Sequence, residues 1–174
     1  MSVDSERRLA LCSLLALLWP LIMGAATYRD SFNDRVLAAH NQERALLGLP
    51  PLRWNAQLAS GAQQWSDELA QTGNFAHSPD TPGTSPLGEN IWGGTPGRFE
   101  PEQMVGLWIQ EKRHFRPGRF PHNSRTGKVA DVAHYTQLVW RETHEVGCGL
   151  SRGNEEILVC RYSQPGNIIG QSVH

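Results

Sequence analysis

The chain has 174 residues, with 16 Lys and Arg against 17 Asp and Glu, which gives a formal net charge of −1. A chain with so little net charge has no basic field of the kind that attracts nucleic acid, so the composition argues against a nucleic-acid partner. We expect one domain over residues 27–174, because about 148 residues can bury roughly two-thirds of their unfolded surface in a single core.

Residues 1–26 have the pattern of an export signal. Arg7 and Arg8 precede an uncharged apolar stretch that ends in the small residues "GAA". This order is typical of a signal peptide, and we expect cleavage after Ala25 or Ala26, with a secreted, extracellular or periplasmic location. An uncleaved anchor is the alternative, because the stretch has nearly the length that spans a bilayer.

Two helices are predicted next. The first begins at Ser31, a residue that caps helices, and ends at Gly48 before two prolines. The second begins near Asn55 and ends at Gly73. Its apolar stripe is formed by Leu58, Ala62, Trp65 and Leu69.

Residues 74–99, rich in Gly, Pro, Ser and Thr, predict a long loop, and long loops in compact domains are usually functional. A third helix is expected from Pro101, since proline suits the first helical position. One face of that helix carries Met104, Trp108, Glu111 and Phe115. Glu111 therefore needs a partner, because an unpaired carboxylate among apolar side chains is costly.

The stretch "VAHYTQLVW", residues 132–140, alternates as a strand does. In a strand, His134 would share its face with Leu138 and Trp140. An ionisable ring would then point toward the core.

Two further strands are predicted on either side of a turn at Gly153 and Asn154. Cys148 and Cys160 are equally far from Asn154 along the chain, so they would lie opposite each other in the hairpin. Directly opposed residues are close enough for a disulfide. We predict this bridge, which suits an oxidising compartment.

Four ionisable residues require an explanation together: His77, Glu89, Glu111 and His134. Taken singly, each has an ordinary interpretation as a hydrogen-bonded or ion-paired structural group. Together they are more suggestive, because neutral imidazoles are common metal ligands and carboxylates can orient them. Their spacing alone does not show that the four meet.

Other clusters have weaker interpretations. Glu111 and His114 form E-x-x-H, but a di-iron bundle needs a second such motif, and the sequence has none. His40 and His144 are expected to be structural or exposed. A solvated basic face is expected after the third helix, formed by Arg113, His114, Arg116, Arg119, His122 and Arg125.

Six motifs in order carry a resemblance to a known family: "LAAHNQERALLGLPPLRW", "FAHS", "GENIW", "MVGLWIQEKRHF", "HYTQLVWRETHEVGCG" and "LVCRYSQPGN". They resemble the successive signatures of the CAP superfamily, which includes cysteine-rich secretory proteins, antigen 5 and pathogenesis-related 1 proteins. The resemblance covers residues 32–167. It departs from the family's usual pattern at Gln164, where many members have a second proline before Gly-Asn.

The resemblance implies an α+β fold, an α-β-α sandwich whose antiparallel sheet of three to four strands has helices on both faces. It also implies that His77, Glu89, Glu111 and His134 are the family's cavity tetrad, whose two histidines can hold a divalent ion, often zinc. No organic cofactor is expected.

The leading hypothesis is therefore a zinc-binding module with a defence or host-interaction role rather than an enzyme. Cell-surface or host proteins are among its expected partners. A metal-dependent hydrolase, with Glu89 or Glu111 as general base, is one alternative. Capture of sterol or another lipid is the other, through loops that carry Phe99, Phe115 and Phe120.

Overall fold

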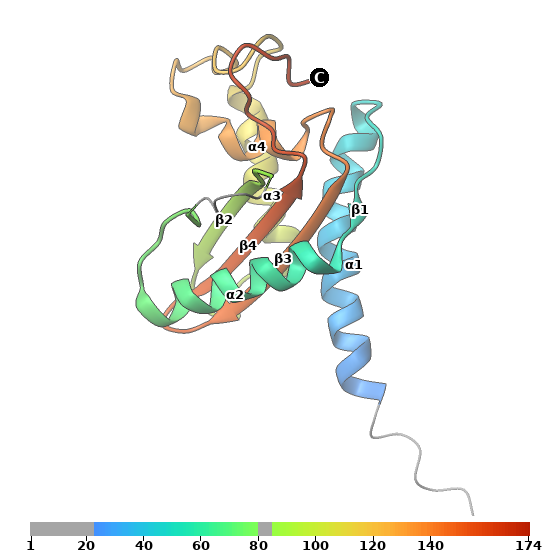
Figure 1. The fold of residues 1–174 in the computed structure, drawn as a ribbon, viewed down its shortest axis with the longest axis vertical. Coiled ribbons are helices and arrows are strands. Elements are labelled where there is room, and N and C mark those ends of the chain that lie inside the picture. Colours follow the sequence, from blue (N-terminus) through green and yellow to red (C-terminus); the bar gives the residue numbers. More distant parts are fainter. Residues whose placement is uncertain (1–22, 80–84) are drawn as a thin grey trace, which may run out of the picture.

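The structure is a computed structural model that describes residues 23–79 and 85–174 (Figure 1). Most of the expected signal peptide lies outside these residues, so its cleavage stays a prediction. Within the described ranges, no helix combines the length and the apolar character needed to cross a membrane.

A four-stranded sheet forms the centre of the fold, in the order β1-β3-β4-β2. β3 (Glu145–Arg152) pairs antiparallel with β4 (Glu156–Ser163), and β4 pairs antiparallel with β2 (Gly88–Gly94). The short β1 (Arg53–Trp54) runs parallel to β3. The expected α+β fold is confirmed, and the sheet is antiparallel except for β1.

Helices cover both faces of this sheet, as a sandwich requires (Figure 1). α2 (Ala56–Thr72) packs on one face, where a smaller core joins it to alternate residues of β2 and β4. α1 (Met23–Leu46) and α3 (Pro101–Gln110) lie on the other face, over the larger core. Successive side chains of each strand therefore point to opposite faces of the sheet and pack into two separate cores.

The approach of α2 to β3 depends on two glycines. A Cβ atom on Gly149 would lie 2.3 Å from the Cα of Gln63, and one on Gly147 would lie 2.2 Å from the amide nitrogen of Ala59. Asn55 begins α2 by accepting hydrogen bonds from the amides of Gln57 and Leu58. The predicted helix from Asn55 to Gly73 is confirmed.

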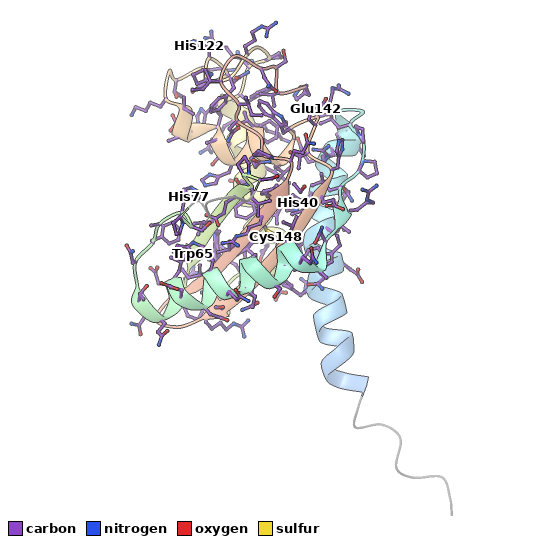
Figure 2. All side chains as sticks on the ribbon, in the orientation of Figure 1. His40, Trp65, His77, His122, Glu142 and Cys148 are labelled. Atoms are coloured by element: carbon purple, nitrogen blue, oxygen red, sulfur yellow. A yellow bond between two sulfur atoms is a disulfide. The ribbon has the colours of Figure 1, made fainter. Side chains whose placement is uncertain are left out.

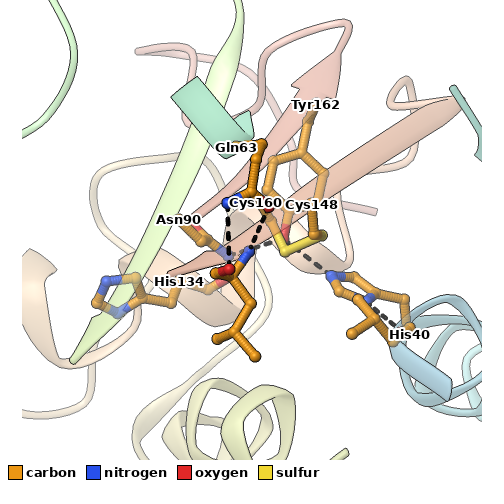
Figure 3. The surroundings of a disulfide bond; sticks show 9 residues. His40, Gln63, Asn90, His134, Cys148, Cys160 and Tyr162 are labelled. Atoms are coloured by element: carbon orange, nitrogen blue, oxygen red, sulfur yellow. Dashed lines mark hydrogen bonds between the residues drawn. A yellow bond between two sulfur atoms is a disulfide. The ribbon is translucent and has the colours of Figure 1, made fainter. Parts of the chain in front are cut away.

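The hairpin of β3 and β4 is also confirmed. Cys148 and Cys160 are direct partners in its register, with Cα atoms 4.1 Å apart and a disulfide between them (Figure 3). On the edge side of β3, the side-chain amide of Gln63 accepts from the backbone N–H of Leu150 and donates to its carbonyl. Gln63 thus satisfies the backbone N–H and carbonyl of Leu150 as a neighbouring strand would.

Three expectations for the elements are wrong. Residues 88–94 of the expected loop form β2, whose glycines weaken the strand pattern. The stretch 132–140 is mainly helical, as α4 (Ala133–Leu138), and not a strand. Its polar residues Thr136 and Gln137 are as buried as Leu138. The alternation of polar and apolar residues therefore does not separate buried from exposed side chains in this segment.

The third discrepancy concerns the helix ends. α1 begins at Met23 rather than at Ser31, and it ends close to the expected Gly48. α3 ends at Gln110, and the next four residues form a single 3₁₀ turn, η1 (Glu111–His114). Glu111 therefore stands at the junction between α3 and η1.

Candidate functional site

Glu89 on β2 forms the centre of the first site. Its Oε1 lies 2.9 Å from His77 Nδ1 and accepts the backbone N–H of Ser78 at 2.9 Å. Its Oε2 accepts from the Ser78 hydroxyl at 2.7 Å and from Arg161 Nε at 3.3 Å. The Glu89 side chain is only 8% exposed, whereas that of His77 is 66% exposed. A buried carboxylate therefore holds a solvent-facing imidazole.

Glu111 has the same role in the second site. Its Oε1 lies 2.6 Å from His134 Nδ1, and its Oε2 accepts the backbone N–H groups of His134 and Tyr135, each at 3.0 Å. These amides belong to the first turn of α4, where N–H groups have no partner within the helix. The His134 ring also stacks on Trp108 of α3, with ring centroids 6.0 Å apart.

A buried chain of hydrogen bonds connects the second site to α1 (Figure 3). Asn90 Nδ2 donates to the His134 carbonyl and to the Tyr162 hydroxyl, each at 3.1 Å. The Tyr162 hydroxyl lies 2.9 Å from His40 Nε2, and His40 Nδ1 lies 2.8 Å from the carbonyl of Val36. Since Nδ1 faces a carbonyl, it carries the proton, so Nε2 accepts from Tyr162.

The surroundings of His77 and His40 shift the pKa values of these two rings in opposite directions. The hydrogen bond to Glu89 raises the pKa of His77. Burial favours the neutral form of Glu89, but hydrogen bonds from His77 and Ser78 outweigh it and lower the pKa of that carboxyl. Full burial lowers the pKa of His40 to about 4, so this ring is neutral at pH 7.

The four predicted site residues thus form two His–Glu pairs. Asn90 follows Glu89 on β2 and bonds to the backbone of His134, so the two pairs belong to adjoining elements. In the described part of the chain, neither pair bonds to the other, and no group of three His, Cys, Asp or Glu residues is placed to hold a metal. The Nε2 atoms of His77 and His134 have no hydrogen-bond partner among the described residues.

Sequence reasoning missed several residues that support these pairs. Ser78 and Arg161 both donate to Glu89, and Asn90 positions α4. Ser78 and Asn90 directly follow His77 and Glu89 in the chain, so their place in the motifs was an available signal. Arg161 is the register partner of Glu89 across β2 and β4, which only the sheet pairing reveals.

The three phenylalanines considered for lipid capture pack against other side chains of the fold. Phe120 is buried, Phe115 packs edge-on against Tyr135, and Phe99 packs edge-on against Trp92. Phe99 also lines an open groove of about 1270 Å³ between α1, α2 and the beginning of α3. Its other apolar lining includes Phe32, Met104 and Leu150.

Comparison with known proteins identifies the family. The sequence model of the cysteine-rich secretory protein family, CAP, matches residues 37–162. Pathogenesis-related protein 1C of Nicotiana tabacum is 35% identical over 155 residues, which cover 87% of this chain and 86% of the relative. Pathogenesis-related protein 1 of Arabidopsis thaliana is 33% identical over 173 residues, which cover 98% of each chain.

Solved structures agree with this fold. The crystal structure of NaASP2 with Zn²⁺ superposes with a TM-score of 0.71 at 21% identity, covering 83% of this chain and 85% of that protein. The crystal structure of MpPR-1i superposes with a TM-score of 0.55 at 27% identity, covering 78% of this chain and 89% of that protein.

Proposed function

The chain belongs to the cysteine-rich secretory protein (CAP) family, and we propose that it is an exported binding protein whose His77 and His134 hold a Zn²⁺ ion. The observation that carries the proposal is the matched pairing of each imidazole Nδ1 with a glutamate. NaASP2, a protein of the same fold, has been crystallised with Zn²⁺.

The donor set fits this metal. A histidine that ligates a metal usually donates its other ring N–H to a carboxylate, which sets the tautomer and the ring orientation. Glu89 and Glu111 accept from Nδ1 in this way, which leaves both Nε2 atoms free to bind. Two imidazoles supply only part of a tetrahedral shell, so water or a ligand atom would complete an open, reversible site.

The surroundings of the carboxylates favour binding over hydrolysis. A general base needs an oxygen that can reach a water molecule. Glu89 receives four hydrogen bonds, about as many as a carboxylate can accept, and Glu111 receives three, so most of their acceptor sites are already occupied. Both glutamates are therefore better suited to orienting histidines than to removing a proton from water.

Isothermal titration calorimetry tests the zinc site. At neutral pH we expect one site in the native chain and none in the His77→Ala, His134→Ala double variant. The matched control removes two exposed histidines outside the site, His122→Ala with His144→Ala, and should keep the site. Absence of binding in the native chain, or its survival in the first variant, would show that the proposal is wrong.

Lipid or sterol capture is a second candidate function, which the groove beside Phe99 favours. Its volume lies above the roughly 300–1000 Å³ that is typical of small-molecule pockets. This function predicts that a radiolabelled sterol binds equally well to the native chain and to the double histidine variant. Phe99→Gln should weaken it, and an unchanged affinity in that variant would exclude the groove.

The biological role that we propose is defence or host interaction outside the cell. It follows the names of the pathogenesis-related relatives, and the apolar segment before α1 is consistent with export. Mass spectrometry of the exported protein should find a chain that begins at residue 26 or 27. A chain that still starts at Met1 would indicate a retained anchor instead.

A further inference from the structure

Positive charge is concentrated in one segment of this nearly neutral chain. Residues 112–128, here called the basic lobe, contain six of the 16 Lys and Arg residues and none of the 17 Asp and Glu residues. Every Lys and Arg side chain of the lobe is exposed. His122 of the lobe lies at one end of the molecule, far from the start of α1 (Figure 2).

Five of these six cations have no acidic partner among the residues that the structure describes. Lys112 pairs with Glu43, but within the described ranges no ion pair reaches the other five. Three of them instead donate to backbone carbonyls: Arg116 to His122, Arg119 to Gly170 and Arg125 to Phe115. Each guanidinium keeps further N–H groups that can bind an anion. The arginines are thus held in place without being neutralised.

Two exposed isoleucines lie beside the lobe. Phe120 of the lobe exchanges backbone hydrogen bonds with Gly170 and Gln171, which holds the C-terminal segment against it. Ile168 and Ile169 directly precede Gly170 in the chain, so this contact brings them close to the lobe. Ile169 is 80% exposed, and Ile168 is 39% exposed. Figure 1 shows the C-terminal segment at the same end of the molecule as the lobe.

We propose that the basic lobe and the two isoleucines together dock onto the surface of an anionic lipid bilayer. Unneutralised Lys and Arg are attracted to acidic headgroups, and exposed aliphatic side chains gain free energy when they enter the interface. A soluble polyanion would use the charges but not the isoleucines, so the combination favours a bilayer. The lobe begins directly after Glu111, but among the described residues none of its Lys and Arg side chains bonds to either His–Glu pair, so the proposed docking does not depend on zinc.

Vesicle sedimentation of the full chain tests the proposal. The lipids are phosphatidylcholine alone and an equal mixture of phosphatidylcholine with phosphatidylserine. Because the apolar segment before α1 can bind either bilayer, the readout is the ratio of the two partition coefficients. We expect the ratio to favour the anionic vesicles strongly at low salt and to fall as salt screens the charges.

Charge variants locate the surface. Arg113→Gln with Lys128→Gln removes two lobe charges without breaking a hydrogen bond to a backbone carbonyl. It should lower the ratio by about 25-fold, or roughly fivefold for each charge. The matched control, Arg53→Gln with Arg98→Gln, removes two exposed charges outside the lobe and should change it by less than about twofold.

Ile169→Gln tests the apolar part of the surface. It should weaken binding to the anionic vesicles by about tenfold. Leu46→Gln removes an aliphatic side chain of similar exposure, 78%, from the end of α1 and should have no effect. Equal binding to the two lipid mixtures, or equal losses in both charge variants, would overturn the proposal. The proposal would also be overturned if soluble polygalacturonate bound tightly and with the same affinity to the native chain and to Ile169→Gln, because the partner would then be a polyanion in solution.

Discussion

Burial and hydrogen bonding give three histidines of this chain different properties. His40 lies fully within the core, where it is neutral and links α1 to Tyr162. His77 is mostly exposed and is held by a buried carboxylate, which favours its charged form. His134 is held between Glu111 and Trp108 at the beginning of α4. These properties come from neighbours that are distant in the sequence.

His40 should make the protein less stable in acid. Its pKa is about 4 in the folded chain and about 6.5 when unfolded. Between these values only the unfolded state binds the proton, so the free energy of unfolding falls as pH decreases from about 6.5 to about 4. The loss from this residue is about 3 kcal/mol.

Nuclear magnetic resonance of the imidazole ring measures the pKa of His40 in the folded chain directly. The His40 signals should stay unchanged from pH 7 until the pH approaches 4. In denaturant unfolding, His40→Gln should lose less stability than the native chain over this pH range. Titration of His40 near 6.5 would contradict the assignment.

At the level of elements, the sheet and α2 make contact because two positions lack side chains. Gly147 and Gly149 face the backbone of α2, and a methyl group at either would overlap backbone atoms that cannot rotate away. The disulfide lies on the opposite face of the sheet, toward the larger core. The close contact of α2 with β3 is thus a matter of backbone shape.

Gly149→Ala should therefore destabilise the fold. The added methyl would force α2 away from β3, and overpacking of this kind costs about 1–3 kcal/mol. Gly106→Ala is the matched control, because no heavy atom lies within 4 Å of its added methyl and it lies inside α3. That change should stabilise the chain by about 0.5–1 kcal/mol. Denaturant unfolding of both variants measures the difference, and equal stabilities would contradict this account of the packing.

For the whole molecule, the proposed zinc site joins parts of the chain that fold onto different elements. His77 precedes β2, whereas His134 belongs to α4. An ion that needs both histidines binds the folded chain and not the unfolded one. Zinc should therefore stabilise the entire domain rather than one loop.

Thermal unfolding with and without zinc checks this coupling. At a free zinc concentration 100 times its dissociation constant, the free energy of unfolding should rise by about 2.7 kcal/mol. The double histidine variant should show no increase. Calcium at the same concentration should also have no effect, because it prefers oxygen ligands. A zinc effect of equal size in the variant would place the ion elsewhere.

The elements that could be predicted from sequence have local causes. α2 has a capping Asn55, a terminal Gly73 and one apolar stripe, all of which act within the helix itself. The hairpin follows from its turn, and the disulfide follows from equal distances to that turn. The pairings of Glu89 with His77 and of Glu111 with His134 could not be derived from spacing, because each joins different elements.

The amino-acid sequence was enough to predict the family, the α+β class, α2 and the hairpin with its Cys148–Cys160 bridge. That four ionisable residues form one site stays a prediction. Contacts between distant segments determine that residues 88–94 complete the sheet and that residues 133–138 are helical, because neither segment has a decisive local signal. β2 is rich in glycine, and α4 is buried on polar and apolar sides alike, so each takes its form from contacts with the rest of the fold.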